Sequence, residues 1–489
     1  MSTCSPLRRV DVAIVGAGPA GMFVARRLLS ERRDMAIALI DKGKPAHLRS
    51  SAHPFSQRNG WDTHDIISGV GGAGLFSDGK LVLTLSAGGN LTHGLWGNRQ
   101  AEYVRYVEQA LLQSESVSAR CSEKADPGFI DTVQKHGLSY KHLPVRHFGT
   151  SSLLSIIEGI TGQLLSCPKV TLHSDRLATS IEKRGDSFVV ETMNPAGGFE
   201  RVSAKNVVFA VGKEGSPWLA DILRPFGVKS SKNRIYFGVR MEAPATEALS
   251  KFSFDPKLST VFEDGTKIKT HCFCTSGKIL PLRYFGLPLA GSHTPDIDWN
   301  CGRNKENTVL GILLGDSEEA PVSSDLLFEM MATVKAIGKG RLLAQRLGDF
   351  RANRASTRSE IAGGPVRPSV AEFMPGNLRE LRLPLSFDAK LLDFVERLGA
   401  LAPSLSSDGV ILYAPAVEWW MPRIETDATM ETVHPGLYVA GDGAGVSQGI
   451  MYAAATGVLV ADSILTKIGQ LPSSIHEPAD ALVQPVSAL

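Results

Sequence analysis

The stretch that most constrains the fold is residues 12–41, VAIVGAGPAGMFVARRLLSERRDMAIALID. It begins with a short apolar run, which is typical of a strand buried on both faces. The glycine pattern G-x-G-x-x-G follows at once, at Gly16, Gly18 and Gly21. The first glycine allows a tight turn, the second allows close approach to a pyrophosphate, and the third lets the next helix pack on the strand. The stretch therefore predicts a strand, turn and helix that bind a dinucleotide.

Two further residues fit the same unit. Pro19 stands where the first turn of a helix accepts a proline, so the free N–H groups and the positive end of that helix face the phosphates. Asp41 ends a second apolar strand twenty residues after Gly21, where a carboxylate can accept hydrogen bonds from a ribose. The alternative is a Rossmann-like unit that binds nothing.

The composition excludes several classes of protein. With 52 basic and 50 acidic residues, the net charge of +2 gives no electrostatic reason to expect nucleic acid or an anionic membrane as a partner. The N-terminus enters the first strand without the apolar stretch of a signal peptide, and we expect no membrane span, so we predict a cytoplasmic protein. The 6 cysteines are too few and too scattered for a disulfide framework.

A second glycine-rich segment, GVGGAGLFSDGKL, covers residues 69–81. Its glycines, which include Gly72 and Gly74, leave backbone N–H groups open to bind a flat or anionic group. A mobile surface loop is the alternative. Apolar side chains within and beside the segment are expected to be buried and to hold it in place, which favours the ligand interpretation.

The middle of the chain changes character twice. Short strands separated by turns are predicted at residues 170–192, and NVVFAV at residues 206–211 predicts a buried strand that contains Ala210 and ends at Gly212. This pattern indicates an antiparallel meander inserted before the chain rejoins the first sheet. Residues 235–314 predict strands separated by glycine, proline and charged turns, which indicates a second, sheet-rich domain. A long helical pattern covers residues 323–347.

The segment GLYVAGD, residues 436–442, predicts another short buried strand that stops at Gly441 and Asp442. Asp442 would then lie at the carboxyl end of a parallel strand, where α/β sheets bind ligands, although it could instead cap the helix predicted over residues 443–468. The tail, residues 471–489, is polar and contains proline, and we predict that it is disordered.

These motifs together resemble flavoproteins of the glutathione-reductase-like FAD superfamily. The resemblance lies in GAGPAG near the start, NVVFAVG in the middle and TVHPGLYVAGDGAG near the end. The chain is more closely similar to a group of FAD-dependent dehydrogenases and oxidoreductases marked by a GGAG-x-FSDGKL loop, here residues 71–81. Other matching segments are RHFGTSSLL, VVFAVGKEGSPWL, FGVRME, HCFC, APAVEWWMP and GVSQGIMYAAATGVLVADSI, so the resemblance covers nearly the whole chain.

The resemblance implies an α/β protein with a discontinuous Rossmann-like FAD-binding domain, residues 1–233 and 405–470, and a second sheet-rich α+β substrate or cap domain, residues 234–404. It places the pyrophosphate of FAD on the first glycine turn, the adenosine ribose on Asp41, and the adenine against the backbone near Leu177. The flavin end would meet the second motif. The residues expected to contact FAD are Gly16, Gly18, Pro19, Ala20, Gly21, Asp41, Lys42, Gly72, Gly74, Leu177, Ala210, Gly212, Gly441, Asp442, Gly449 and Ile450.

The function expected from this resemblance is an FAD-dependent oxidoreductase that transfers a hydride between the flavin and a small organic metabolite. Three alternatives stay open: a monooxygenase that uses NAD(P)H and oxygen, a reductase of isoprenoid-type double bonds, and a non-catalytic flavin-binding protein. No second G-x-G-x-x-G unit occurs between residues 100 and 400, so any NAD(P)H is expected to bind transiently. No metal site is expected.

Three residues are candidates for catalysis. Glu418, beside two tryptophans, would act as an acid or base with a raised pKa, or else form a structural salt bridge. Lys80 would stabilise negative charge on reduced flavin, or else be exposed. Cys272 and Cys274 lie two residues apart on a predicted strand, so their side chains should share a face; they would form a redox pair or be two buried structural cysteines.

Overall fold

The computed structural model describes residues 7–49, 63–84, 87–89, 95–112, 120–233, 235–246, 249, 252, 255–274, 276–293, 307–317, 322, 324–419, 421–470 and 472. The chain divides into two compact units. Unit 1 contains residues 1–119, 150–233 and 420–489, and unit 2 contains residues 120–149 and 234–419. The division differs from the predicted one at residues 120–149 and 405–419, which belong to unit 2. The predicted disordered tail lies outside the described residues, apart from Pro472.

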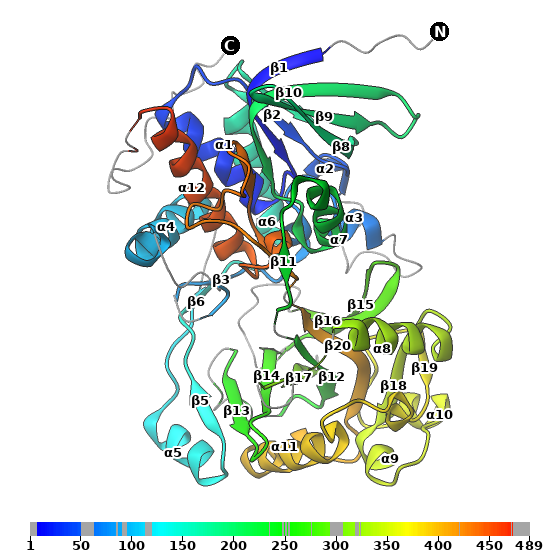
Figure 1. The fold of residues 1–489 in the computed structure, drawn as a ribbon. Coiled ribbons are helices and arrows are strands. Elements are labelled where there is room, and N and C mark those ends of the chain that lie inside the picture. Colours follow the sequence, from blue (N-terminus) through cyan, green and yellow to red (C-terminus); the bar gives the residue numbers. More distant parts are fainter. Residues whose placement is uncertain are drawn as a thin grey trace, which may run out of the picture. The chain divides into compact units, whose positions relative to one another are not determined.

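Unit 1 is built on a parallel sheet (Figure 1). Its parallel strands lie in the order β7-β2-β1-β10-β22. Sequence order therefore reverses between β1 and β10, which is where doubly wound sheets bind ligands. These strands are β1 (Leu7–Val15), β2 (Ile37–Ile40), β7 (Val170–His173), β10 (Phe199–Phe209) and β22 (Leu437–Val439).

The predicted antiparallel meander is present. It consists of β8 (Leu177–Arg184), β9 (Ser187–Met193) and the first half of β10. Because β10 is long, its first half pairs with β9 while its last residues pair in parallel with β22. One strand thus belongs to both the meander and the parallel sheet, so the meander is a part of unit 1.

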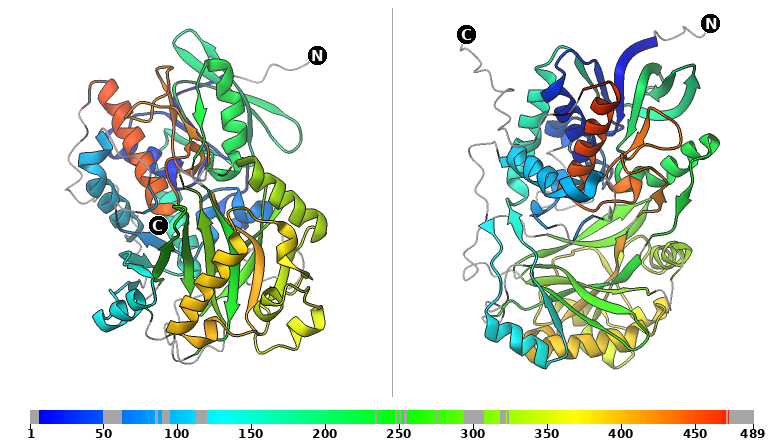
Figure 2. Two further views of the ribbon diagram at one scale, coloured as in Figure 1. Left: turned by 60° about the horizontal axis from the view of Figure 1, so that its bottom comes forward. Right: turned by 60° about the vertical axis from the view of Figure 1, so that its left-hand side comes forward.

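Helices surround the parallel sheet. The C-terminal helix α12 (Ile450–Lys467) contacts both α1 (Pro19–Glu31) and α4 (Leu95–Leu112), as Figures 1 and 2 show. Close packing of α12 on α1 requires Gly457, because a Cβ there would lie 2.2 Å from the carbonyl oxygen of Ala20. The remaining elements of unit 1 are α2 (Ala46–Arg49), α3 (Thr63–Ile67), η2 (Ala73–Phe76), β3 (Lys80–Val82), α6 (Thr150–Leu165), α7 (Gly212–Leu223), η3 (Arg224–Phe226), β11 (Ser230–Ser231), β21 (Arg423–Ile424) and η7 (Asp442–Ala444).

Unit 2 contains a largely antiparallel sheet with the strand order β19-β18-β20-β12-β17-β14-β13-β5. Strand β5 (Ser139–Lys141) pairs with β13 (Lys257–Val261), and β20 (Ile411–Trp419) pairs with β12 (Ile235–Ala243). Because of these two pairings, residues 120–149 and 405–419 belong to unit 2. The other strands of the sheet are β14 (Lys267–Cys274), β17 (Thr308–Gly315), β18 (Leu342–Arg346) and β19 (Phe373–Pro375).

Helix α11 (Phe387–Leu401) lies across this sheet (Figure 2), and its Phe387 ring is 5.9 Å from the ring of Phe237. The hairpin of β15 (Lys278–Tyr284) and β16 (Leu287–His293) contributes to a separate apolar core together with β17, β18 and β20. The remaining elements are β4 (Arg120–Cys121), α5 (Pro127–Lys135), β6 (Val145–His147), α8 (Ser324–Ile337), α9 (Leu347–Arg351), α10 (Arg358–Ala362), η5 (Leu378–Leu381) and η6 (Pro403–Leu405).

Two predicted helices are shorter than expected. The helix predicted over residues 323–347 is wrong in its second half: α8 ends at Ile337 and the chain continues as strand β18. A Cβ at Gly338 would lie 2.3 Å from the carbonyl oxygen of Arg341, so the chain turns tightly there instead of extending the helix. The C-terminal helix begins at Ile450, after the short turn η7, and not directly at residue 443.

Candidate functional site

The predicted glycine turn lies at the carboxyl end of β1, next to the end of β10. Gly16 has φ +108°, and a Cβ there would lie 2.2 Å from the carbonyl oxygen of Ala210. A Cβ at Gly21 would lie 1.9 Å from the carbonyl oxygen of Gly16. Both residues must therefore be glycine because the protein's own backbone occupies the space.

Gly18 differs from these two glycines. It is the N-cap residue of α1, no side chain caps the helix there, and its backbone is extended. A Cβ at Gly18 would meet only the Cα of Gly72, at an ordinary contact distance of 3.6 Å. The free N–H groups of a helix's first turn attract an anion. The folded chain thus leaves space in front of this helix end and supplies no side chain to fill it.

Asp41 lies directly behind the turn and is 8% exposed. Its Oδ2 accepts a hydrogen bond from the backbone N of Ala17 at 2.8 Å, and its Oδ1 accepts one from Gly43 N at 2.9 Å. Burial raises the pKa of Asp41, and the two hydrogen bonds and nearby basic residues oppose that rise. The carboxylate therefore fixes the turn, and its remaining lone pairs can still accept hydrogen bonds from a ribose.

The second glycine-rich segment packs beside the first turn. The backbone N of Gly71 donates to the carbonyl oxygen of Ala17 at 2.8 Å. A Cβ at Gly72 would lie 3.4 Å from Pro19, and one at Gly74 would lie 2.9 Å from Ile450. The segment thus lies between the beginnings of α1 and α12, as the ligand interpretation of this segment requires.

Arg49 holds this segment, and the sequence analysis did not identify it. The side chain is fully buried, and it donates to the carbonyl oxygens of Asp65, Ile66, Val70 and Gly72 at 2.6 to 3.0 Å. Burial lowers its pKa to about 10, against the opposing effects of Asp41 and Asp65. Because the acceptors are backbone carbonyls, no complementary residue type in the sequence could have revealed this role.

The second motif lies at the carboxyl end of β22. Gly441 has φ +74°, and a Cβ there would lie 2.9 Å from the Cβ of Ala20 in α1. The carboxylate of Asp442 accepts hydrogen bonds from Ser447 Oγ at 2.8 Å and from Gly449 N at 3.3 Å. Burial raises its pKa, while nearby Lys213 and those hydrogen bonds oppose the rise. Asp442 therefore holds the segment that leads into α12, but it does not cap this helix, which has no side-chain cap.

Two further glycines border open space at the same edge of the sheet. Gly449 is the N-cap of α12, has φ +88° and carries no side-chain cap, and nothing lies within 4 Å of a Cβ built there. Gly212, at the start of α7, likewise has φ +64° and open space around its Cβ position. The starts of α1, α7 and α12 follow β1, β10 and β22, respectively, at the carboxyl edge of the parallel sheet.

The predicted adenine contact lies near Asp41. The backbone N of Arg176 donates to the carbonyl oxygen of Asp41 at 2.8 Å, and Leu177 follows at the start of β8. Leu177 is an exposed apolar side chain, 44% accessible. Lys42 follows Asp41 directly and is partly exposed. All sixteen residues expected to contact FAD therefore belong to unit 1, at or near the carboxyl ends of its parallel strands.

Lys80 is not exposed, and its role beside reduced flavin stays a prediction. Its side chain is only 8% exposed, and its Nζ lies 2.8 Å from the carboxylate of Asp78. The alternative that Lys80 is simply exposed is wrong. The neighbouring carboxylate balances the charge of Lys80, so this lysine does not present an uncompensated positive charge to a ligand.

Glu418 lies in unit 2, on β20, and forms a salt bridge. Its Oε2 is 2.6 Å from Lys269 Nζ and 3.2 Å from His271 Nδ1. Burial by itself would raise the pKa of Glu418, but His271 and Lys269 lower it below its ordinary value. The prediction of a raised pKa is wrong, because the two tryptophans adjacent in sequence matter less than two cationic residues on another strand.

Cys272 and Cys274 do not share a face of β14. The register with β17 shifts between His271, opposite Gly311, and Cys274, opposite Val309, so the strand contains one extra residue. Cys272 lies in this bulge with φ +47° and is partly exposed, whereas Cys274 is 1% exposed in the apolar core. Both are thiols in the structure. The prediction from i, i+2 spacing is wrong because a bulge interrupts the alternation of a strand.

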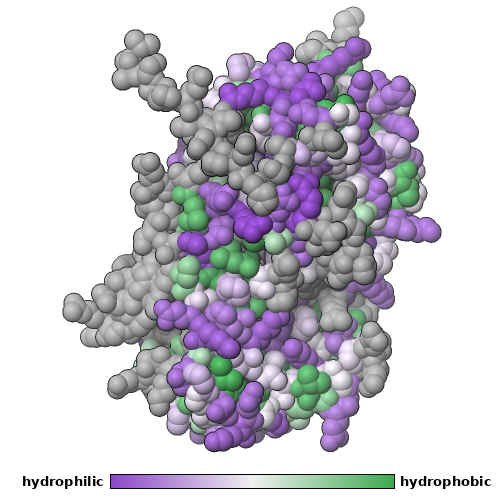
Figure 3. Space-filling view, turned by 90° about the vertical axis from the view of Figure 1, so that its left-hand side faces the viewer, coloured by the Kyte–Doolittle hydropathy of each residue, from purple (hydrophilic) through white to green (hydrophobic). Residues whose placement is uncertain are grey.

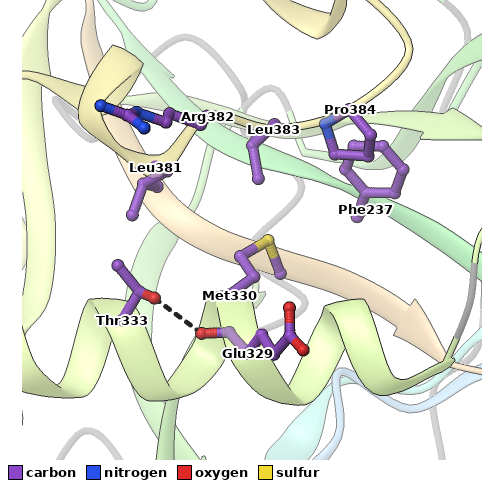
Figure 4. Close-up of a pocket in the computed structure, with 8 residues that line it drawn as sticks. All are labelled: Phe237, Glu329, Met330, Thr333, Leu381, Arg382, Leu383 and Pro384. Carbon is purple, nitrogen blue, oxygen red and sulfur yellow. Dashed lines mark hydrogen bonds between the residues drawn. The ribbon is translucent and has the colours of Figure 1, made fainter.

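Unit 2 also contains a pocket of about 210 Å³, shown in Figure 4. Met330 of α8 and Leu383 point into it from opposite sides, and Phe237 of β12 closes one end. The hydroxyl of Thr333 donates to the carbonyl oxygen of Glu329 at 2.8 Å within α8. The pocket contains none of the residues predicted to act in catalysis. The residues that line it are Phe237, Glu329, Met330, Thr333, Leu381, Arg382, Leu383 and Pro384.

Comparison with known proteins gives distant similarities. No family model matches the chain. An uncharacterised protein of Clostridium beijerinckii is 23% identical over 487 residues, which cover 93% of this chain and 80% of that protein. Among solved structures, a flavoprotein/dehydrogenase from Cytophaga hutchinsonii has 12% identity and a TM-score of 0.42, covering 97% of this chain and 82% of its own. A glycine oxidase from Geobacillus kaustophilus has 13% identity and a TM-score of 0.40, covering 94% and 95%. These values are too low to assign an activity.

One described helix, α12, has the length and composition of a membrane span. Its mean hydropathy is 1.3 over 18 residues, but 89% of that window is buried inside the protein, as in the core helix of a globular domain. The expectation that the chain has no membrane span stays a prediction. On the face shown in Figure 3, the hydrophobic residues among those described form small separate groups between hydrophilic ones.

Proposed function

We propose that this protein is an FAD-dependent oxidoreductase of the group marked by the GGAG-x-FSDGKL loop, and that unit 1 binds the FAD. One observation carries the proposal. The helices α1 and α12 both begin at a glycine, Gly18 and Gly449, with no side-chain cap, and both follow strands of one parallel sheet. Uncapped helix ends beside open glycine surfaces suit an anionic dinucleotide, because the backbone N–H groups are left for the ligand.

The residues present fit the parts of FAD. The first turn of α1 behind Gly18 would hold the pyrophosphate, and Asp41 would accept hydrogen bonds from the adenosine ribose. Asp442 would do the same for the ribityl chain. The start of α12 at Gly449 would face the flavin ring, where its partial positive charge favours an anionic reduced flavin. The loop of residues 69–76, held by Arg49, would cover the gap between these two helix ends.

Bound FAD would supply hydride acceptance or donation, and the protein would bind, orient and tune it. We propose a small organic metabolite as the substrate and a cytoplasmic location. Any NAD(P)H would bind only transiently, since the sequence contains no second dinucleotide turn between residues 100 and 400.

The test is the visible spectrum of the purified protein compared with that of Gly18→Ala. The added methyl meets only Gly72 in the protein, at 3.6 Å, so the variant should fold. A methyl pressed against the pyrophosphate should weaken binding by about 1 to 3 kcal/mol, or roughly 5- to 150-fold in Kd. Gly159→Ala is the matched control, because a Cβ there meets nothing within 4 Å and lies in α6 of the same unit.

Flavin bands in the wild type and in Gly159→Ala, with weaker FAD binding by folded Gly18→Ala, would support the proposal. A wild-type protein that is colourless and does not bind added FAD would overturn it. Anaerobic addition of NADPH then separates two classes of reaction. Bleaching of the flavin indicates a monooxygenase or reductase, and an unbleached flavin indicates a dehydrogenase reduced by its own substrate.

A further inference from the structure

Strand β14 in unit 2 carries a cysteine in an unusual backbone conformation. Cys272 lies in the bulge with φ +47°, a region that residues with a side chain rarely adopt. The carboxylate of Asp255 fixes the bulge by accepting a hydrogen bond from the backbone N of Phe273 at 2.8 Å. Asp255 is itself paired with Lys257, at 2.8 Å. Strained residues of this kind persist only where the surroundings hold them, and they are concentrated at functional sites.

Charged residues from three strands contact one another around His271, the neighbour of Cys272 in the sequence. His271 and Lys269 of β14 both lie against the carboxylate of Glu418 on β20, at 3.2 and 2.6 Å. Arg240 of β12, which is 7% exposed, donates from Nη1 to the carbonyl oxygen of His271 at 3.1 Å. A glycine at position 311, between β12 and β14, gives Arg240 the room for this contact. Lys269 and His271 therefore lie against one carboxylate, and Arg240 holds the backbone of His271 beside the bulge.

The histidine side chain connects this cluster to the thiol. Burial by itself would lower the pKa of His271, but its hydrogen bond and electrostatic interaction with Cys272, together with Glu418, raise it above the ordinary value. Glu418 also fixes the ring through Nδ1. A carboxylate that orients an imidazole beside a thiol is the arrangement that activates cysteine nucleophiles, and a positively charged imidazole next to a thiol favours the thiolate.

We propose that Cys272 is a reactive thiolate, held as an ion pair with the imidazolium of His271, and that it is a site of covalent modification by small electrophiles of the hydroperoxide class. The thiolate sulfur attacks one peroxide oxygen, so an S–O bond forms as the O–O bond breaks. Sulfur loses two electrons and becomes a sulfenic acid, and the peroxide is reduced to water or an alcohol, with protons drawn from solvent. This site belongs to unit 2 and does not depend on flavin binding.

The other described cysteines lack these surroundings. Cys121 is exposed, Cys274 is buried in the apolar core, and Cys167 bonds through its thiol to the carbonyl oxygen of Arg33 at 3.4 Å. They provide internal references within one molecule. Because Cys274 lies in the core and not on the face of Cys272, a sulfenic acid at Cys272 is not expected to resolve into a disulfide between them.

The experiment is alkylation of the full native chain by limiting iodoacetamide across pH 5.5 to 9.5, with each cysteine quantified by peptide mass spectrometry. A thiol whose pKa is lowered by a neighbouring imidazolium is thiolate to a larger extent at pH 6 than an ordinary thiol, but a thiolate of low pKa is intrinsically less nucleophilic. We therefore expect Cys272 to react about tenfold faster than Cys121 at pH 6 and about tenfold slower at pH 9.5.

Such a crossing of the two rates supports the proposal, and it needs no variant. If Cys121 reacts faster than Cys272 throughout the range, or if both rates rise in parallel with pH, the proposal is overturned. His271→Gln should remove the advantage of Cys272 at pH 6, whereas His136→Gln, at an exposed histidine of unit 2, should leave it unchanged. After treatment with hydrogen peroxide and dimedone, the adduct should appear at Cys272 before it appears at Cys121.

Discussion

The two candidate sites of this protein differ in the groups that form them: backbone groups in unit 1 and side chains in unit 2. In unit 1, the carboxyl edge of the parallel sheet offers backbone groups, because glycines begin α1, α7 and α12 and no side chain occupies their surface. In unit 2, the candidate site consists of side chains from β12, β14 and β20 that contact His271 or Glu418. A backbone site suits a large anionic cofactor, which needs many N–H donors. A side-chain cluster suits chemistry at a single atom.

The two sites should also differ in which substitutions they tolerate. At the carboxyl edge of the parallel sheet in unit 1, the effect of replacing a glycine on folding should depend on the space around the new Cβ. In the cluster of unit 2, substitutions act through charge, and their effect should depend on pH.

The largest effect is expected for Gly16→Ala. The new Cβ would lie 2.2 Å from the carbonyl oxygen of Ala210, at φ +108°, so we expect a loss of at least about 4 kcal/mol in the free energy of unfolding. Gly212→Ala is the matched control, since its φ is +64° but nothing lies within 4 Å; it should lose only about 1 to 2 kcal/mol. Urea denaturation of both variants provides the measurement. Equal losses of stability in the two variants would mean that the positive φ, and not the contact with the carbonyl oxygen of Ala210, causes the loss.

Arg49→Met is expected to follow. It removes four hydrogen bonds to buried carbonyl oxygens around the loop of residues 63–72, which should lower the free energy of unfolding by about 3 to 4 kcal/mol. Arg184→Met, at a side chain 51% exposed, should leave the denaturation midpoint in place. Limited proteolysis would report whether this loop becomes accessible. An unchanged midpoint for Arg49→Met would show that this loop does not depend on the arginine.

Glu418→Gln tests the charge cluster of unit 2. At pH 7 it leaves Lys269 without its partner, and we expect a loss of about 3 kcal/mol in the free energy of unfolding. The pKa of Glu418 is lower in the folded chain than in the unfolded chain, so the unfolded chain takes up the proton first as the pH falls. The wild type should therefore lose stability below about pH 4.5, its ordinary pKa, and the difference between the two proteins should shrink there.

Denaturation curves at pH 7 and pH 4 would check this expectation. Glu182→Gln, at an exposed ion pair with Arg184, is the control and should show no measurable change at either pH. A difference between the wild type and Glu418→Gln that stays constant with pH would mean that packing, and not charge, accounts for the loss.

The smallest effect is a gain. Gly159→Ala lies on an exposed turn of α6 with nothing near its Cβ, so it should raise the free energy of unfolding by about 0.5 to 1 kcal/mol through helix propensity alone. A thermal melt would measure this gain. A loss of stability would show that the space around the new Cβ does not by itself predict the effect of replacing a glycine in unit 1.

Particular elements show where the sequence was sufficient. The strands around the first turn, the meander of β8, β9 and β10, and the strand β22 shortly before Asp442 all lie where the patterns predicted them. These patterns depend on local properties: the burial of a strand on both faces and the freedom of glycine. The pattern failed at α8, whose apolar spacing continues into β18, because an apolar run fits a buried strand as well as a helix.

By itself, the sequence determined the parallel sheet of unit 1 and the glycines at its carboxyl edge, because backbone sites need residues at fixed local spacing. Only the tertiary structure decided the state of Glu418, the separation of Cys272 from Cys274, the burial of Lys80 beside Asp78, and the role of Arg49. For Glu418 and Arg49, the physical reason is that the partners are residues on another strand or backbone carbonyl oxygens, which no residue type at a fixed distance along the chain reveals. The two cysteines are separated by a bulge, which the alternation of a strand does not predict. Asp78 is close to Lys80 in the sequence, but the burial of this pair depends on how the chain packs around it.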